Sequence, residues 1–285
     1  MQRDKLSGKI LITGRGMLGT AWHLMLSSRG IGHQVLERSV LDISDQDAVE
    51  TIIREGTALV VNTAAFTDVD GAETKPDLAR LVNSTAVGFL AQRCQQVGAT
   101  LIHYSTDYVF GGLAKHPYPV STPHDPINVY GHSKAAGETQ VWNLSEDHLV
   151  IRTSWLYASW GDNFVRTMLQ VLRNTPEVSV VADQRGRPTS ALHLAEASWE
   201  LFLQGSRGTF HVCDEGDCTW YDFAQEISRL CNAKVQIQAC GTDAFPRPAP
   251  RPAYSVLDLS QTTERIGPLS EWQCNLAQVI REFPP

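Results

Sequence analysis

Residues 9–19, KILITGRGMLG, decide the fold class of this chain. The first five form an apolar run that predicts a buried strand, and Gly14, Gly16 and Gly19 follow that run directly. Residues 20–28 then have the composition of a helix, which stops before Gly30. A strand, a glycine turn and a helix in this order are typical of a dinucleotide-binding turn, because glycines let backbone amides approach a pyrophosphate and the helix N-terminus faces it.

The second predicted strand bears on the choice of dinucleotide. It covers residues 32–37 and ends at Glu37 and Arg38, about 20 residues after the glycine turn. A carboxylate at this place favours a free ribose 2′-hydroxyl, whereas Arg38 or Arg15 could neutralise a 2′-phosphate. The residues alone therefore leave NADH and NADPH open. Asp42, a little further on, is either a turn residue or a contact to the adenine.

A third apolar run at residues 58–61 ends in the small residues 62–65, NTAA. Small residues at the carboxyl end of a strand let a ligand lie close to the backbone, which is where open α/β sheets bind ligands. Alternation of such strands with helices predicts a right-handed parallel sheet covered on both faces, a Rossmann-type doubly wound α/β fold.

Two helices are expected around this third strand. Ser44 and Asp47 form a capping-box pattern for a helix that runs to Arg54. A longer helix is expected over residues 76–97, where Gly98 would end it. Asn83 lies inside this long helix, and a solvated or locally hydrogen-bonded side chain is the ordinary expectation for it.

Candidate catalytic groups follow the fourth predicted strand, residues 100–104. Ser105, Thr106 and Asp107 come directly after the strand, and Tyr130 and Lys134 stand four residues apart at the start of a helical pattern. Four residues are about one helical turn, so the phenol and the ammonium share a face. This pairing suggests a tyrosine acid whose pKa is lowered by the neighbouring cation.

The pattern changes after a fifth strand at residues 148–153 and Trp155. Helices over 163–173 and 191–204 and strands over 178–182, 209–213 and 235–239 are expected, with Thr219 and Ser270 as helix N-caps. The proline-rich run 245–252 cannot be regular structure, and it is either a linker or an ordered lid that brings Arg251 to an anionic substrate. We expect a dinucleotide-binding domain of residues 1–155 plus about 189–205, and a smaller α/β substrate domain of 156–188 and 206–285.

Composition excludes several classes of function. A net charge of −7 without a basic tract argues against nucleic acid as a partner. The charged N-terminus and the lack of an apolar run near the roughly 18 residues of a membrane span indicate a cytoplasmic protein. The six cysteines show no Cys-x-x-Cys pair and no histidine at zinc spacing, so we expect reduced thiols and no metal site.

The assembled motifs resemble the extended short-chain dehydrogenase/reductase family, and within it the dTDP-4-dehydrorhamnose reductases. The resemblance covers nearly the whole chain. The blocks that carry it are the glycine turn, STDYVF at 105–110, NVYG at 128–131, RTSWLY at 152–157, Asn163-Phe164, Asp183-Gln184 with Pro188-Thr189, and Arg251-Pro252 with Ser255.

This resemblance implies an oxidoreductase of nucleotide-sugar biosynthesis. NAD(P)H, with NADPH the first choice and NADH possible, would deliver hydride to the C4 ketone of a nucleotide-linked 4-keto-6-deoxyhexose such as dTDP-4-dehydro-L-rhamnose. Tyr130 would donate the proton, Lys134 would favour the phenolate and hold the nicotinamide ribose, and Thr106 would orient the carbonyl.

The resemblance also implies two binding sets. The cofactor set is Gly14, Arg15, Gly16, Met17, Leu18, Gly19, Arg38, Asp42, Ile43, Ala64, Ala65, Thr67, Asn83, Ser105, Tyr130 and Lys134. The substrate set is Val69, Thr106, Asp107, Tyr108, Trp155 and Arg251.

Two departures from the family pattern affect these expectations. The family turn has one more residue between its first two glycines than Gly14-Arg15-Gly16, which bears on cofactor preference. Some members bind magnesium through glutamates at a dimer interface, where this chain has Ala21 and Leu192. We therefore expect no metal-bridged dimer and a monomer or weak homodimer.

Rival interpretations remain. A sugar-nucleotide dehydratase of this superfamily would carry a glutamate where this chain has Tyr108, and an epimerase belongs to the same class of alternatives. A non-catalytic regulatory subunit with the nucleotide-binding fold would work by binding a partner and would not need Thr106, Tyr130 and Lys134. The base of the nucleotide and the configuration of the product at C4 also remain open.

Overall fold

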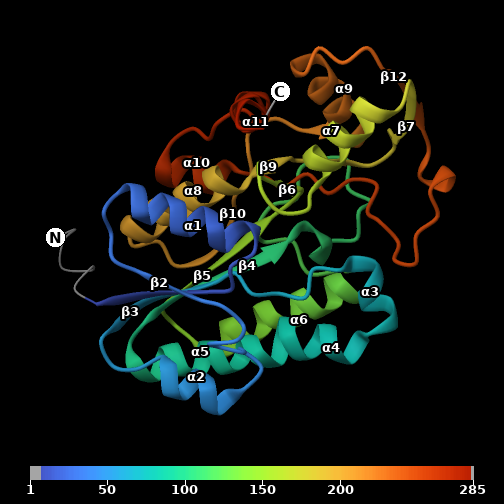
Figure 1. Ribbon diagram of the computed structural model, residues 1–285. Coiled ribbons are helices and arrows are strands. Elements are labelled where there is room, and N and C mark those ends of the chain that lie inside the picture. The colour runs from blue at the N-terminus through green and yellow to red at the C-terminus, as the bar shows by residue number, and fades with distance from the viewer. Residues whose placement is uncertain (1–7, 284–285) are drawn as a thin grey trace.

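The computed structural model describes residues 8–283 and places a six-stranded parallel sheet at the centre of the molecule (Figure 1). The strand order is β10-β5-β4-β3-β1-β2. The strands are β1 (Lys9–Thr13), β2 (Gln34–Leu36), β3 (Thr57–Asn62), β4 (Thr100–Thr106), β5 (His148–Thr153) and β10 (Gly208–His211). All neighbouring strands of this sheet run parallel, as the alternating pattern predicts.

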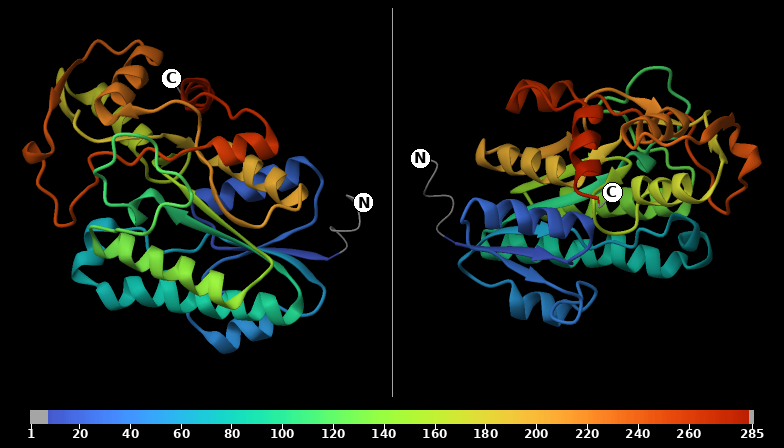
Figure 2. Two further views of the ribbon diagram at one scale, coloured as in Figure 1. Left: turned by 180° about the vertical axis from the view of Figure 1, so that it is seen from behind. Right: turned by 45° about the horizontal axis from the view of Figure 1, so that its top comes forward.

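Helices cover both faces of the sheet (Figures 1 and 2). One face carries α1 (Met17–Ser28) and α8 (Ala191–Leu203), and the other carries α2 (Gln46–Ile52), α5 (Ala86–Val97) and α6 (Val129–Leu144). The strand β1 serves both layers, because Ile10 and Ile12 join one buried cluster and Leu11 joins the other. Burial on both sides explains why the strand is a continuous apolar run. The doubly wound fold is confirmed.

The chain direction reverses between β1 and β3. From β1 the chain moves outward to β2 and then crosses back to β3 on the other side of β1. In open α/β sheets ligands bind at such a switch point, outside the carboxyl ends of the strands. The glycine turn after β1 and the small residues after β3 both lie at this point.

The predicted long helix is interrupted. It consists of α4 (Pro76–Arg80), a π-helical segment (Leu81–Thr85) and α5, and Gly98 ends it with a φ of 69°. A short helix α3 (Val69–Thr74) precedes it. Asn83 lies in the π-helical turn and is 1% exposed, so a solvated side chain is excluded.

A smaller lobe lies at the upper right of Figure 1, away from α2 and α5. Its helices are α7 (Phe164–Asn174), α9 (Trp220–Leu230) and α11 (Trp272–Arg281), whereas α10 (Ser260–Ile266) packs on α8 and β10 of the larger half. Its two-stranded sheets pair β6 (Leu156–Tyr157) with β9 (Thr189–Ser190), β7 (Glu177–Val181) with β12 (Gln236–Cys240), and β8 (Arg185–Gly186) with β11 (Cys218–Thr219). Short 3₁₀ turns cover Asp107–Val109 and Thr242–Ala244.

Several predicted boundaries need correction. The strand β10 belongs to the six-stranded sheet and not to the substrate domain, because Gly208–His211 pairs with β5. The N-cap of α2 is Asp45, whose carboxylate accepts from Ala48 N, while Ser44 bonds to Asp42. Thr219 is confirmed as an N-cap, but α11 begins after Glu271, without the expected cap from Ser270. Within residues 8–283 no helix is both long and apolar enough to cross a membrane.

Candidate active site

The glycine turn shows two kinds of glycine. Gly14 has a φ of +81°, which side chains disfavour, and a Cβ on Gly19 would come within 2.1 Å of Gly14 O. These two positions are structural necessities of the turn. At Gly16, by contrast, a Cβ would have no described atom within 4 Å. Gly16 caps α1 without a side-chain hydrogen bond, so the first turn of the helix offers free backbone amides to an anion at the open side.

A buried polar chain lies under this turn. Thr13 Oγ1 donates to Asn62 Oδ1 at 2.7 Å, and Asn62 Nδ2 donates to His103 Nδ1 at 3.0 Å. Thr63 Oγ1 donates to the carbonyl of Thr13. These bonds tie the carboxyl ends of β1 and β3 to the middle of β4. Ala64 lies close to the turn, since a Cβ on Gly14 would meet it at van der Waals distance. The cofactor side of the site therefore consists of backbone and small side chains that hydrogen bonds hold in place.

Thr106 and Tyr130 meet at the end of β4, and Lys134 bonds to the same strand. Asn128 caps α6 by accepting from Gly131 N at 2.7 Å, which sets Tyr130 in the first helical turn. A Cβ on Gly131 would lie 2.2 Å from Tyr108 O, so the start of α6 presses directly on the segment after β4. The rings of Tyr108 and Tyr130 meet edge to face, 5.8 Å apart. The start of α6 therefore holds Tyr130 beside the segment that follows Thr106, and the catalytic roles of both residues stay predictions.

Thr106 and Lys134 make further contacts at this place. Thr106 Oγ1 donates to Asp107 Oδ1 at 3.0 Å and accepts from Tyr108 N at 3.2 Å. Lys134 is 3% exposed, and its Nζ donates to the carbonyl oxygen of Tyr104 at 2.5 Å. The hydroxyl and the ammonium are thus held by β4 itself.

The protonation of these groups differs from the sequence expectation. Burial, followed by the charge of Asp107, raises the pKa of Tyr130 to about 12, although a hydrogen bond with Thr106 opposes the shift. Burial lowers the pKa of Lys134 to about 8. The expectation of a lowered tyrosine pKa is therefore wrong for this structure, because the phenolate is desolvated and the Lys134 ammonium bonds to Tyr104 O instead. A neutral Tyr130 is suited to donate a proton.

Asp107 is a second acid in the site. It is 2% exposed, and burial raises the pKa of its carboxyl to about 6, against hydrogen bonds from Ser255 and Thr106. Its negative charge is one reason for the raised pKa of Tyr130.

Trp155 lies between β5 and β6, where the chain passes from the large sheet into the smaller lobe. Its φ of 46° is rare for a residue with a side chain, and strained backbone of this kind is concentrated at functional sites. Its indole stacks on Trp220 with ring centroids 3.6 Å apart, and a Cβ on Gly186 would come within 2.6 Å of the ring. Trp155 remains only partly buried, so part of the indole is available to a ligand.

The proline-rich segment is ordered by contacts with the nucleotide-binding half. Arg251 NH1 and NH2 donate to the two carboxylate oxygens of Asp70 at 2.9 and 3.0 Å, and Ala249 N donates to the same carboxylate at 3.2 Å. Asn128 Nδ2, on the N-cap of α6, donates to Pro250 O at 2.9 Å. Of the two sequence interpretations, the ordered segment fits these contacts. The Arg251 guanidinium is nevertheless occupied by Asp70.

The end of β2 carries two exposed ion pairs. Arg15 NH1 lies 3.1 Å from Glu37 Oε1, and Arg38 Nε lies 3.1 Å from Asp42 Oδ2. The pKa of Asp42 is lowered, and hydrogen bonds from Ser44 are the main cause. Both arginines are in reach of solvent, so either can exchange its carboxylate for a phosphate at little cost.

The remaining residues of the predicted cofactor set differ in which of their atoms can reach a cofactor. Leu18 and Ile43 are buried in the two hydrophobic clusters, so only their backbones can face a cofactor. The Asn83 amide is used inside the protein, with Phe66 N, Phe66 O and Ser133 Oγ as its partners at 2.8 to 2.9 Å. Ser105 is 5% exposed within β4. Ala65, Thr67 and Val69 lie on the loop after β3 and at the start of α3.

Four residues of the site region were not identified from the sequence: Asp70, Glu138, Arg152 and Trp220. The strongest missed signal is Arg152, a charged residue inside the otherwise apolar strand β5, where it requires a buried partner. That partner is Glu138 on α6. Asp70 and Trp220 gave no local signal, because their partners lie 181 and 65 residues away along the chain.

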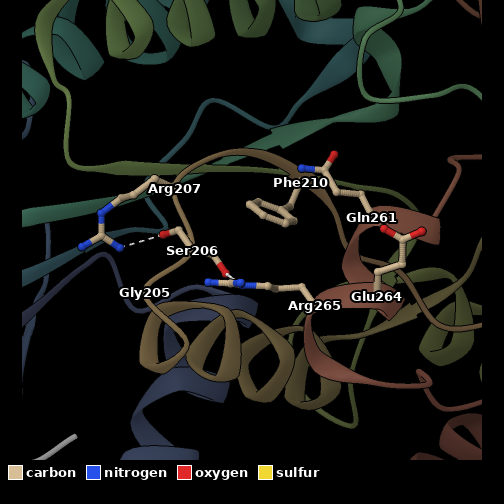
Figure 3. Close-up of a pocket in the computed structure, with 7 residues that line it drawn as sticks. All are labelled: Gly205, Ser206, Arg207, Phe210, Gln261, Glu264 and Arg265. Carbon is tan, nitrogen blue, oxygen red and sulfur yellow. Dashed lines mark hydrogen bonds between the residues drawn. The ribbon is translucent and has the colours of Figure 1, made fainter. Parts of the chain in front are cut away.

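A distinct hollow of about 440 Å³ lies elsewhere (Figure 3). Its lining residues are Gly205, Ser206, Arg207, Phe210, Gln261, Glu264 and Arg265. It sits at the amino end of β10, the opposite edge of the sheet from Thr106. Arg207 pairs with Asp147, and Arg265 Nε donates to Ser206 Oγ at 3.0 Å, so both guanidinium groups already have partners. This hollow is not the candidate site.

Comparisons with known proteins agree with this geometry. The model of the family described as the RmlD substrate binding domain matches residues 8–284. A dTDP-4-dehydrorhamnose reductase of Mycolicibacterium smegmatis is 38% identical, over 97% of this chain and 86% of its own length. A dTDP-4-dehydrorhamnose reductase of Bacillus anthracis, solved in complex with NADP, superposes with a TM-score of 0.94 at 34% identity, over 97% of this chain and 100% of its own. One from Clostridium acetobutylicum has a TM-score of 0.92 at 38% identity, over 96% and 98% of the two chains.

Proposed function

The chain belongs to the RmlD substrate binding domain family of dTDP-4-dehydrorhamnose reductases, and on that premise we propose that it reduces dTDP-4-dehydro-L-rhamnose to dTDP-L-rhamnose with NADPH. The observation that carries the proposal is the arrangement at the end of β4, where Thr106 bonds to Tyr130 and Lys134 bonds to Tyr104 O, and where burial favours the neutral form of Tyr130. Neighbours with this fold perform other reactions, so the site and not the fold supports the assignment.

The glycine turn fits a dinucleotide. Open space at Gly16, free amides at the start of α1 and small residues at Ala64 and Ala65 would accommodate the pyrophosphate and the sugar beside it. Arg15 and Arg38 would hold a 2′-phosphate, which supports NADPH over NADH. When bound, the reduced nicotinamide supplies the hydride that adds to C4 of the sugar.

The chain's own residues supply the proton. The Thr106 hydroxyl orients the ketone oxygen, and the Tyr130 hydroxyl transfers its proton to that oxygen as negative charge develops on it. Hydride and proton together convert the ketone to the alcohol, and Tyr130 is left as a phenolate. Lys134, buried on the same helical face, stabilises that phenolate and contacts the nicotinamide ribose.

Substrate recognition is assigned to both sides of the site. Val69, Asp107, Tyr108 and Trp155 contact the sugar nucleotide in this proposal, and Arg251 serves its diphosphate. Tyr108 stands where a dehydratase requires a carboxylate, which favours reduction over elimination. The division into a dinucleotide half and a substrate lobe is part of the same proposal.

The assembly state and the location complete the proposal. Ala21 is fully buried in the core, so its position cannot present a metal ligand at a subunit interface. We assign the protein as a cytoplasmic monomer or weak homodimer, which size measurement with and without a chelator tests. A magnesium-dependent dimer would refute this assignment.

The decisive experiment follows absorbance of the reduced nicotinamide. Purified protein is mixed with NADPH, or separately NADH, and with dTDP-4-keto-6-deoxy-L-mannose. We expect sugar-dependent oxidation that is faster with NADPH, and dTDP-L-rhamnose as the product. Cofactor binding without oxidation would contradict the reductase assignment and favour a regulatory subunit.

A further inference from the structure

One turn after Lys134, α6 carries a second buried charge. Glu138 is fully buried, and Arg152 of β5 binds it with two nitrogens: Nε lies 2.9 Å from Oε1 and NH2 lies 2.7 Å from Oε2. His124 Nε2, from the loop before α6, lies 2.8 Å from Oε2. An ion pair inside a protein core loses the hydration of both charges, so stability alone is a weak reason for its presence.

The surroundings of Arg152 hold this pair in one arrangement. Its NH1 donates to Val120 O at 3.0 Å, and its guanidinium lies 5.0 Å from the centre of the Phe110 ring. His211 Nε2 of β10 lies 3.4 Å from NH1. Hydrogen bonds and the charge of Arg152 outweigh burial and lower the pKa of Glu138 to about 2, so the carboxylate is charged at neutral pH.

The same pair reaches the catalytic strand. In the register of the sheet Arg152 lies beside Ser105, and Thr153 lies beside Thr106. Ser105 stands between Tyr104, whose carbonyl receives Lys134 Nζ, and Thr106. The guanidinium that holds the Glu138 carboxylate therefore belongs to the residue paired with Ser105, next to the segment of β4 that positions both groups.

The protonation state of Lys134 depends on the charged groups that are packed around it. The titratable groups around Lys134 and Glu138 come from five elements: Tyr130 on α6, His103 on β4, Arg152 on β5, His211 on β10 and His124 in the loop. Burial keeps His103 and His211 neutral, the latter with a pKa of about 3. Glu138 is the charge that opposes the burial of Lys134.

We propose that Glu138 is a positioning residue of the reductase site, which keeps Lys134 protonated and directed toward Tyr104 O while Arg152 and His124 hold the carboxylate in place. This inference rests on the proposed function through the role given to Lys134. The proposal adds a requirement beyond the three catalytic residues, because the buried ammonium of Lys134 needs a buried negative charge on the same helix.

The test is the pH dependence of kcat in Glu138→Gln. Without the carboxylate, Lys134 loses its proton at lower pH. The alkaline limb of the profile, where kcat declines as pH rises, should therefore shift to a pH about one unit lower. Activity above the limb would then fall about tenfold, while activity well below it would stay within a few-fold of the unaltered enzyme. Glu138→Asp retains the charge, and its limb should stay at the original pH.

A second variant guards against misfolding. Glu138→Gln leaves Arg152 buried without its partner, whereas Glu138→Gln combined with Arg152→Met removes both charges. The double variant should show the same displaced limb. An unchanged limb in either folded variant, or a loss of kcat that is equal at every pH, would overturn the proposal and leave Glu138 a structural residue.

NADPH affinity gives a readout that does not need turnover. Because Lys134 contacts the nicotinamide ribose, affinity should weaken as the lysine loses its proton, and at lower pH in Glu138→Gln than in the unaltered protein. An unshifted affinity profile contradicts the positioning role. A shifted affinity profile in a protein that never oxidises NADPH would uphold the positioning role and refute the proposed reaction.

Discussion

The two sides of the candidate site are built from different materials. The cofactor side consists of backbone and small residues from a short stretch of chain, with Gly14 and Gly19 in contact and Gly16 open. The substrate side consists of long side chains from distant segments, where Asp70 meets Arg251 and Trp155 meets Trp220. Substitutions on the first side should act through space and backbone geometry, and those on the second through charge and stacking.

The catalytic residues lie where the two sides meet, so their loss should have the largest effect. Tyr130→Phe removes the donated proton and retains the ring against Tyr108. We expect kcat to fall about 10²–10⁴-fold. NADPH affinity, measured by fluorescence titration, should change little. Near-normal turnover in this variant would refute the assignment of Tyr130 as the acid.

The buried ion pair below the site should dominate acid unfolding. The folded-state pKa of Glu138, about 2, lies below its usual value of 4.5, so its contribution to stability is fully present above pH 4.5 and is lost as pH falls toward 2. The shift corresponds to roughly 3 kcal/mol. Denaturant unfolding between pH 6 and pH 3 should show roughly 2 kcal/mol of this loss, because pH 3 lies about 1.5 units below the usual pKa. The double variant Glu138→Gln, Arg152→Met should show a flatter dependence, and equal slopes would contradict the prediction.

The glycine turn offers a matched pair of substitutions. In Gly19→Ala the new methyl would clash with Gly14 O, so we expect a loss of about 1–3 kcal/mol in the free energy of unfolding. Gly16→Ala meets no described atom and should preserve the melting temperature while weakening NADPH binding several-fold. If Gly16→Ala binds NADPH normally, the pyrophosphate does not approach the turn at that residue.

The smallest effect is expected at the ordered proline-rich segment. Arg251→Ala removes the two-nitrogen contact to Asp70 and a cation for the substrate diphosphate. We expect KM for the sugar nucleotide to rise about tenfold, equivalent to about 1.4 kcal/mol, with kcat within a few-fold. Asp70→Asn is the control, because it weakens the ion pair and leaves Arg251 free for the diphosphate. Equal increases of KM in both variants would make the Asp70 contact, and not the diphosphate, the role of Arg251.

Local pattern predicted the parts of the molecule that depend on neighbours in sequence. The strand and helix around the glycine turn, the cap at Thr219 and the one-turn spacing of Tyr130 and Lys134 follow from short stretches of chain. The wrong predictions are of two kinds. One kind chose between neighbouring residues, as when Ser44 was expected as the N-cap of α2 and Asp45 takes that place. The other kind concerned strand pairing between distant segments, as when β10 was assigned to the substrate domain and pairs with β5. A strand's partner cannot be identified from its own residues.

By itself the sequence determined the doubly wound sheet, the glycine turn and the placing of Tyr130 and Lys134 on one helical face, because periodicity and spacing are properties of the chain. Only the tertiary structure decided the state of the charges. The pKa of Tyr130 rises instead of falling, Arg251 is held by Asp70, and the charge of Glu138 opposes the effect of burial on the pKa of Lys134. The physical reason is that the free energy of a charge depends on burial and on partners brought together by folding, and neither is encoded in local spacing.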